Sequence, residues 1–89
     1  MTVYVDDMYL YPIGRFGNMK MSHLVADTTE ELLDMVDKIG VQRKWIQNPG
    51  TFNEHFDIAM SKRTLAIKHG VIAITWRDMA LMRLQKRSG

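Results

Sequence analysis

Side chains able to bind metal ions or to transfer protons occur in three short stretches of the chain. Asp6 and Asp7 follow an apolar alternation near the start, His23 lies in a semi-apolar segment, and His55 and Asp57 stand two apart. Carboxylates and imidazoles serve as general bases and as ligands of divalent metals. Since the chain has no cysteine, thiol chemistry and disulfides are excluded. These five residues are the candidate catalytic groups, and Asp6, His23 and His55 are the candidate metal ligands.

Each candidate also has a structural explanation. Asp6 and Asp7 could simply end a strand and bond the backbone of a turn. Neighbouring residues on a strand point to opposite faces, so at most one of the two is expected at a site. In an extended segment His55 and Asp57 share one side, where the carboxylate could orient the imidazole or both could bind a metal, but this spacing is common by chance. A lone histidine such as His23 is more often a hydrogen-bonded structural residue.

Cations gather where a second helix is expected to begin. Ser61 is predicted to cap this helix, and Lys62 and Arg63 occupy its first turn, although the helix dipole favours acidic residues there. The dipole and the cations would cooperate in binding an anion such as phosphate. These three residues are therefore the candidate phosphate-binding group, and exposed side chains in solvent are the alternative. His69, beside a predicted helix stop, is interpreted as a partner of the helix dipole.

Two segments carry the clearest local signals. Residues 2–6 alternate in the manner of a strand. Residues 29–39 have helical apolar spacing, with a capping box formed by Thr28 and Glu31 and with Gly40 as the stop.

Weaker patterns complete the predicted order of elements. They favour a loop over 9–20, a strand over 20–26, a strand over 41–47 and a loop over 48–54. A helix over 62–69 and a strand over 71–75 that is buried on both faces follow. A final helix, capped by Thr75, is expected to bury Met79, Leu81 and Met82. The alternation predicts a single α/β domain over 1–89, with a three- to four-stranded, mostly parallel sheet, about three helices and frayed residues 85–89. Ligands of such sheets bind beyond the carboxyl ends of the strands.

Composition limits the class of protein. With 46% hydrophobic and 25% charged residues, the chain is expected to be an ordinary globular domain rather than a disordered one. A small core would benefit from homodimer formation. No signal peptide or membrane span is evident, which predicts a cytoplasmic protein. The net charge of +2 is too small to indicate nucleic-acid binding, so the basic C-terminal residues are interpreted as a solvated helix end: Arg77, Arg83, Lys86 and Arg87.

Four blocks together resemble a small family of bacterial and bacteriophage proteins catalogued only as a domain of unknown function. The blocks are "TVYVDDM" at 2–8, "SHLVADTTEEL" at 22–32, "IGVQRKWIQ" at 39–47 and "HFDIAMSKRTLAIKHGVIAIT" at 55–75. The resemblance implies a phage or prophage accessory protein and no particular activity. It also marks family-like positions at Asp6, Asp7, His23, Asp27, His55, Asp57, Lys62 and Arg63.

Two functions of different classes follow. The first is a site that handles phosphate-bearing ligands or nucleotides, in which Asp57 orients His55. A divalent metal is the candidate cofactor. Mixed histidine and aspartate ligands would suit zinc or manganese, and carboxylates alone would suit magnesium. The alternative is a non-catalytic phage protein that binds and modulates a host protein through exposed methionines, Tyr9, Tyr11 and Trp45. DNA binding by the basic C-terminal helix ranks below both.

Overall fold

Strand β3 (Met19–Ala26) is the centre of the sheet in the computed structural model, which describes residues 2–88. Leu24 lies opposite Val5 of β1 (Val3–Val5) on one edge of β3 and opposite Phe56 of β4 (Phe56–Ala59) on the other. Both pairings are antiparallel. The other edge of β1 pairs in parallel with the short strand β5 (Ile72–Ala73), and β2 (Arg15–Phe16) forms a hairpin with the start of β3.

The sheet is therefore mixed and mostly antiparallel, with the order β4-β3-β1-β5, and the prediction of a mostly parallel sheet is wrong. The physical reason lies in the connections. No helix links β1 to β3, because two 3-10 turns, η1 (Met8–Leu10) and η2 (Pro12–Gly14), and the β2 hairpin fill that segment. Without a helical crossover, β3 runs antiparallel to β1. The α/β class and the single small domain are confirmed.

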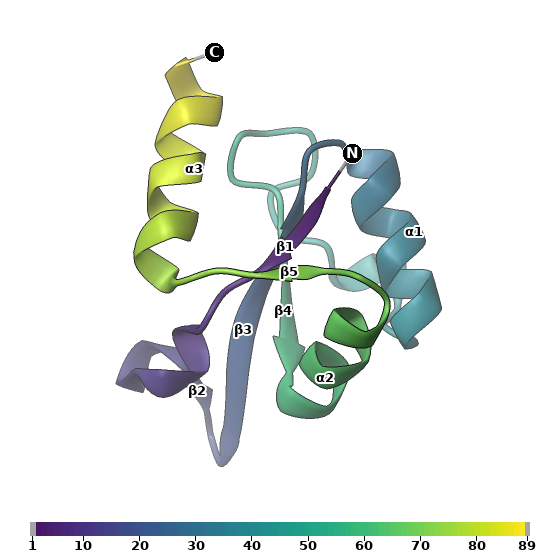
Figure 1. Ribbon diagram of the computed structural model, residues 1–89, viewed down its shortest axis with the longest axis vertical. Coiled ribbons are helices and arrows are strands. Elements are labelled where there is room, and N and C mark those ends of the chain that lie inside the picture. The colour runs from purple at the N-terminus through teal and green to yellow at the C-terminus, as the bar shows by residue number, and fades with distance from the viewer. Residues whose placement is uncertain (1, 89) are drawn as a thin grey trace.

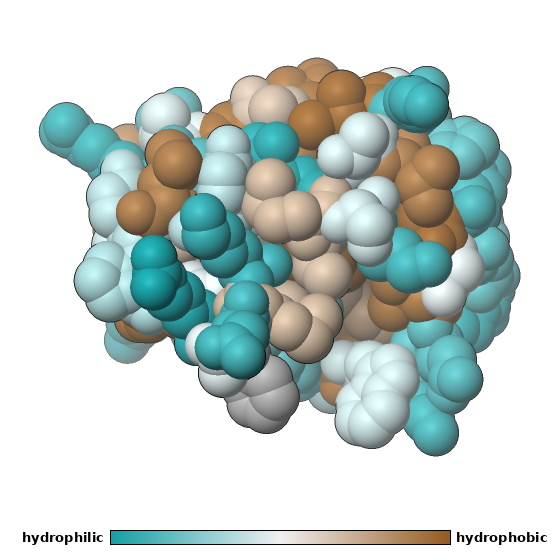
Figure 2. Space-filling model, turned by 90° about the horizontal axis from the view of Figure 1, so that it is seen from below, coloured by the Kyte–Doolittle hydropathy of each residue, from teal (hydrophilic) through white to brown (hydrophobic). Residues whose placement is uncertain are grey.

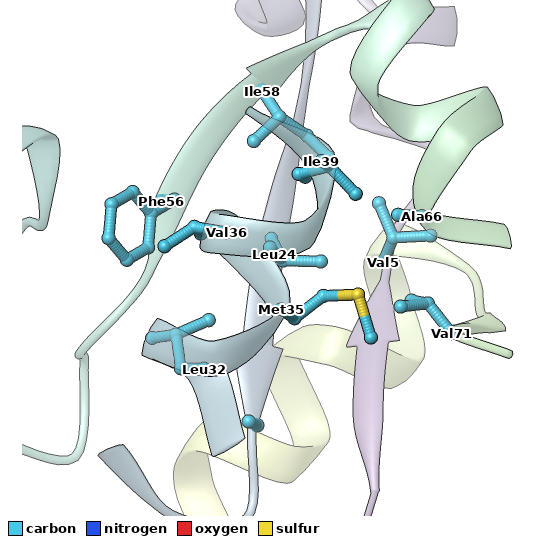
Figure 3. Close-up of a cluster of buried hydrophobic side chains, with 11 residues drawn as sticks. Val5, Leu24, Leu32, Met35, Val36, Ile39, Phe56, Ile58, Ala66 and Val71 are labelled. Atoms are coloured by element: carbon cyan, nitrogen blue, oxygen red, sulfur yellow. The ribbon is translucent and has the colours of Figure 1, made fainter. Parts of the chain in front are cut away.

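Helix α1 (Thr29–Ile39) forms as the capping box predicts. The Thr28 side chain accepts a hydrogen bond from the Glu31 amide at 3.2 Å, and Gly40 ends the helix at φ 78°. The apolar residues of α1 face one side of the sheet. Figure 3 shows the resulting core, which contains Val5, Leu24, Leu32, Met35, Val36, Ile39, Phe56, Ile58, Ala66 and Val71.

Helices cover both faces of the sheet (Figure 1). Helices α1 and α2 (Met60–Lys68) lie on one side, and α3 (Trp76–Ser88) lies on the other. Helix α3 is held at its start by the Asp7 carboxylate, which accepts a bond from the Trp76 amide at 2.6 Å, and by the predicted Thr75 cap. Lys86 then donates to the Ala26 carbonyl at 2.7 Å. The sheet face beneath α3 carries His23 and Val25, since alternate residues of β3 point to opposite sides.

Several predicted elements differ in the structure. Residues 41–47 form the 3-10 turn η3 (Arg43–Trp45) and a single bridge from Gln47 instead of a strand. The extended segment before α2 is the sheet strand β4, although no strand was predicted there. Strand β5 is a two-residue edge in which Ile72 is 48% exposed, so it is not buried on both faces. In each case sheet pairing, which a local pattern does not encode, decides the outcome.

The helix ends also differ from the predictions. Helix α2 starts at Met60, so Ser61 lies in its first turn instead of capping it. Leu81, expected to be buried, is 50% exposed, whereas Met79 is fully buried. Helix α3 extends to Ser88, and Gly89 lies outside the described residues. Over residues 2–88, no helix has both the length and the apolar character needed to cross a bilayer.

Truncating the central core residue should destabilise the domain strongly. Leu24 is fully buried between β1, β4 and α1, so Leu24→Ala is expected to lower the free energy of unfolding by about 2–5 kcal/mol. Urea denaturation measures this loss. Leu81→Ala, at a half-exposed position, is the matched control and should change the free energy by less than about 0.5 kcal/mol. Equal losses in the two variants would contradict the described core.

Candidate metal centre

Three neighbouring strands bring the predicted polar residues into one row. His23 of β3 lies directly opposite Asp57 of β4 in the register, and the Asp6 amide, just after β1, donates to the His23 carbonyl at 3.1 Å. His55 precedes Asp57 by two residues, so both fall on the same face of the sheet. This face is the one opposite the core. The row therefore forms because β3 pairs with β1 and β4 at the same time.

The His23 ring is oriented by a buried carboxylate. His23 Nδ1 lies 2.7 Å from Asp6 Oδ2, and the histidine side chain is 15% exposed. An ionised carboxylate only accepts hydrogen bonds, so Nδ1 must carry the proton of this contact. In the neutral ring, Nε2 is then the unprotonated nitrogen, and its lone pair points away from Asp6.

His55 has the same arrangement with a different partner. Its Nδ1 lies 2.7 Å from the backbone carbonyl of Asn53, which can only accept. In the neutral ring the proton again sits on Nδ1, and Nε2 is left with a free lone pair. The two imidazole rings meet edge to face, with centroids 5.1 Å apart and an interplanar angle of 79°. In their neutral form both histidines thus present an unprotonated Nε2 in the same small region.

Asp57 completes the cluster. Its Oδ2 accepts a hydrogen bond from Gln47 Nε2 at 2.7 Å, whereas its Oδ1 is buried and has no hydrogen-bond partner among residues 2–88. Oδ1 lies 3.5 Å from His55 Nε2 and 3.8 Å from His23 Nε2. One ligand atom from each of the three residues lies within 4.8 Å of the other two. Since no proton is available between these atoms in the neutral tautomers, three electron-rich atoms face each other without a donor.

The spacing of these atoms suits a bound cation. Two ligand atoms of a tetrahedral zinc ion, each bound at 2.0–2.1 Å, are separated by about 3.4 Å. The separations of 3.5 and 3.8 Å from Asp57 Oδ1 are close to this value. Small rotations of the side chains would bring all three atoms into coordination distance. The arrangement of two histidines and one carboxylate can therefore hold a divalent transition metal.

Asp6 is the most buried charged group of the site. Its side chain is fully buried, and its Oδ1 accepts hydrogen bonds from the amides of Met8 at 3.1 Å and His23 at 2.9 Å, in addition to the His23 ring contact. Arg63 Nε donates to the Asp6 backbone carbonyl at 3.1 Å, and its guanidinium lies 4.8 Å from the centre of the Tyr9 ring. The buried carboxylate is tolerated because the two amides and the His23 ring donate hydrogen bonds to it.

The structure brings together four of the predicted catalytic residues: Asp6, His23, His55 and Asp57. Within this group, Asp57 faces the two Nε2 atoms, and Asp6 lies behind His23 as its orienting partner. Asp7 points elsewhere, to the start of α3. Of the predicted phosphate-binding residues, Arg63 donates to the backbone carbonyl of Asp6. Ser61 is exposed, and Lys62 Nζ lies beside Gly40 at the end of α1.

Other predicted polar residues lie outside the cluster. Asp27 accepts a hydrogen bond from the Thr2 amide at 3.1 Å. His69 is exposed at the C-terminal end of α2.

Sequence patterns missed two residues that orient the cluster, Gln47 and Asn53. Gln47 reaches Asp57 because residues 47 and 55 form a β-bridge that turns the intervening loop back onto β4. Asn53 acts through its backbone carbonyl, which every residue type possesses, so no sequence signal exists for it.

A family model described as "Protein of unknown function (DUF4031)" matches residues 3–87, a range that contains every residue of the cluster. No curated protein and no solved structure matches the chain. The matched description names no activity, so the function has to be argued from the residues themselves.

The hydrogen bonds predict the tautomers of the histidines. In the wild-type protein near neutral pH, His23 and His55 should both carry their proton on Nδ1, because their partners only accept. Long-range ¹H–¹⁵N correlation spectra of the rings measure this directly. His69, which is exposed and lies outside the cluster, is the internal reference for these spectra. A proton on Nε2 of either His23 or His55 would contradict the convergence of lone pairs.

The orienting role of Asp6 can be tested by truncation. Asp6→Ala leaves up to three donors without an acceptor, at about 1–3 kcal/mol each, and it should release the His23 ring from its tautomer. Asp7→Ala removes one helix cap and should cost about 1 kcal/mol without changing the His23 ring. Urea denaturation and the ring spectra distinguish the two variants.

Proposed function

The chain belongs to the DUF4031 family of proteins of unknown function, and we propose that it is a metal-dependent protein. His23, His55 and Asp57 bind a divalent transition-metal ion, which acts on a phosphate-bearing ligand. One observation carries this proposal: His23, His55 and Asp57 each place a ligand atom within 4.8 Å of the others, and the buried Asp57 Oδ1 has no hydrogen-bond partner within residues 2–88. A cation is the group that would satisfy all three atoms at once.

The surroundings of the three atoms support the proposal. Each ligand is fixed by a second group: Asp6 holds His23, the Asn53 carbonyl holds His55, and Gln47 holds Asp57. Histidine ligands of protein metals almost always donate their other ring N–H in this way, to a carboxylate or to a carbonyl. A structural histidine cluster has no need for such partners on every member.

The donor set favours zinc among the common metals. Two imidazoles and one carboxylate suit borderline transition metals, whereas magnesium prefers oxygen ligands alone. Three protein ligands leave a fourth position for water or substrate, which is the pattern of catalytic zinc. When bound there, such an ion polarises a phosphoryl oxygen and supplies a nucleophilic water at neutral pH.

A phosphate-bearing ligand is supported by unpaired positive charge beside the cluster. Arg83 Nη1 donates to the side-chain oxygen of Asn53 at 2.9 Å, and the backbone oxygen of Asn53 holds His55. Within residues 2–88, the Arg83 guanidinium forms no salt bridge. Arginine is the residue best suited to bind phosphate oxygens.

Metal titration tests the proposal directly. We expect Zn²⁺ and Co²⁺ to bind with a stoichiometry of one and to raise the melting temperature. Removing a ligand by His23→Ala, His55→Ala or Asp57→Asn should lower the affinity by more than about 100-fold, and Gln47→Ala should lower it by about 10–100-fold. The affinity should also fall on acidification, because the histidine ligands must be unprotonated. Calorimetry and the visible spectrum of the Co²⁺ form measure these effects.

His69→Ala is the matched control, since it removes the third histidine of the chain at an exposed position. It should leave metal affinity unchanged. The proposal fails if the wild type binds Zn²⁺ no better than the His55→Ala variant, or if His69→Ala weakens binding equally. Hydrolysis of a chromogenic phosphate diester by the metal-loaded protein, absent from Asp57→Asn, would extend the result from binding to chemistry.

A non-catalytic protein that binds a host protein is the second candidate. It is favoured by exposed apolar side chains near the β2 hairpin, with Leu10 62% and Ile13 64% exposed, and Figure 2 shows apolar side chains spread over the face seen from below. Tyr9 packs under Arg63, and Tyr11 packs against Trp76, so these two rings are engaged within the chain. This candidate predicts that changes at His55 and Asp57 leave partner binding intact.

The phage or prophage accessory role, the cytoplasmic location and homodimer formation stay predictions. Each depends on the resemblance or on composition rather than on the geometry of the cluster.

A further inference from the structure

A cavity of about 350 Å³ lies beside the proposed metal centre, between the loop over 48–55 and α3. In Figure 1 this loop and the C-terminal half of α3 lie next to each other. The cavity is lined by Phe52, Asn53, Ala80, Arg83, Leu84 and Arg87. Its volume falls within the range of small-molecule sites.

The lining combines an aromatic ring with two cations. Phe52 is 45% exposed, and the guanidinium of Arg87 lies 5.9 Å from the centre of its ring. Arg83 is held by its bond to Asn53 Oδ1 at 2.9 Å. Neither arginine forms a salt bridge with any other residue in 2–88. An exposed ring beside unpaired guanidiniums is suited to a ligand that has both a planar base and a phosphate.

One residue connects the cavity to the metal centre. The side-chain oxygen of Asn53 accepts from Arg83 in the cavity wall, and its backbone oxygen accepts from Nδ1 of His55. A ligand held by Arg83 would therefore lie next to the group that orients a proposed metal ligand. Among the hydrogen bonds of residues 2–88, none links the side chain of Lys62 or Ser61 to the cluster, and Lys62 Nζ lies beside Gly40.

We propose that this cavity is a binding site for a nucleoside monophosphate, with the phosphate on Arg83 and Arg87 and the base against Phe52. The site replaces the first turn of α2 as the phosphate-binding region, since Lys62 lies beside Gly40 at the end of α1. That the metal centre acts on this bound phosphate rests on the function proposed above. Binding of the nucleotide itself does not.

Titration of the full chain with adenosine 5′-monophosphate at low salt tests the proposal, by calorimetry and by amide chemical shifts. We expect saturable binding with shifts centred on residues 52, 53 and 83–87. Arg83→Gln, Arg87→Gln and Phe52→Ala should each weaken binding by about tenfold or more, because each removes a charge-assisted bond or a stacking surface. Arg77→Gln, which removes an exposed arginine of the same helix outside the cavity, is the matched control and should leave affinity unchanged.

Four further outcomes are decisive. Arg87 makes no bond to Asn53 in the cavity wall, so loss of binding in Arg87→Gln with native amide shifts elsewhere supports direct contact. If Arg77→Gln and Arg83→Gln weaken nucleotide binding equally, a general basic surface binds the nucleotide and the proposed cavity site is overturned. The same conclusion follows if a single-stranded oligonucleotide binds much more tightly and both variants weaken its binding equally. Absence of saturable binding would overturn it as well.

The double variant His55→Ala/Asp57→Asn separates this inference from the proposed function. If this variant loses Zn²⁺ but keeps nucleotide affinity, both proposals are supported. If the wild type binds the nucleotide but no metal, the cavity stands and the metal-dependent function fails. If the wild type binds metal but no nucleotide, only the nucleotide-binding proposal fails, and the metal-dependent function is still supported.

Discussion

The rest of the site depends on the burial of one carboxylate. Asp6 is fully buried at the end of β1, and its charge is tolerated only because two backbone amides and the His23 ring donate to it, with the Arg63 guanidinium bonded to its carbonyl. These bonds fix the proton on Nδ1 of His23 and aim its Nε2 at Asp57. A neutral or displaced group at this position would leave the ring without a defined orientation. The buried charge thus connects stability to the geometry of the proposed metal ligands.

Strand β3 allows the core and the site to coexist in so small a chain. Its residues alternate, so that Leu24 packs toward α1 while His23 points to the opposite face. Because β3 is paired on both edges, its backbone is held in place and its side chains are positioned within narrow limits. The same pairing places Asp6 and Asp57 on either side of His23. A site built on paired strands is preorganised without a deep cleft around it.

Electrostatics explain why the predicted anion site and the proposed one differ. Local sequence placed the phosphate at the first turn of α2, where Lys62 and Arg63 oppose the helix dipole. In the fold, Arg63 is turned to the Asp6 carbonyl, and the arginines beside the cavity come from α3, which lies on the same side of the sheet as His23. Positive charge without carboxylate partners accumulates there, and it adjoins the residue that orients His55.

The sequence by itself determined α1, with its Thr28 cap and Gly40 stop, the first strand and the polar residues of the candidate site. These are local properties, since capping, apolar spacing and residue type act over a few neighbours along the chain. It could not determine the antiparallel sheet, strand β4, or the exchange of roles in which Asp57 faces both histidines and Asp6 lies behind one of them. Those features depend on pairings between residues far apart in sequence, such as His23 with Asp57 and Gln47 with His55. Only the tertiary structure decides them, because the energy of a strand pair depends on which partner residues lie across from the strand as well as on the strand's own residues.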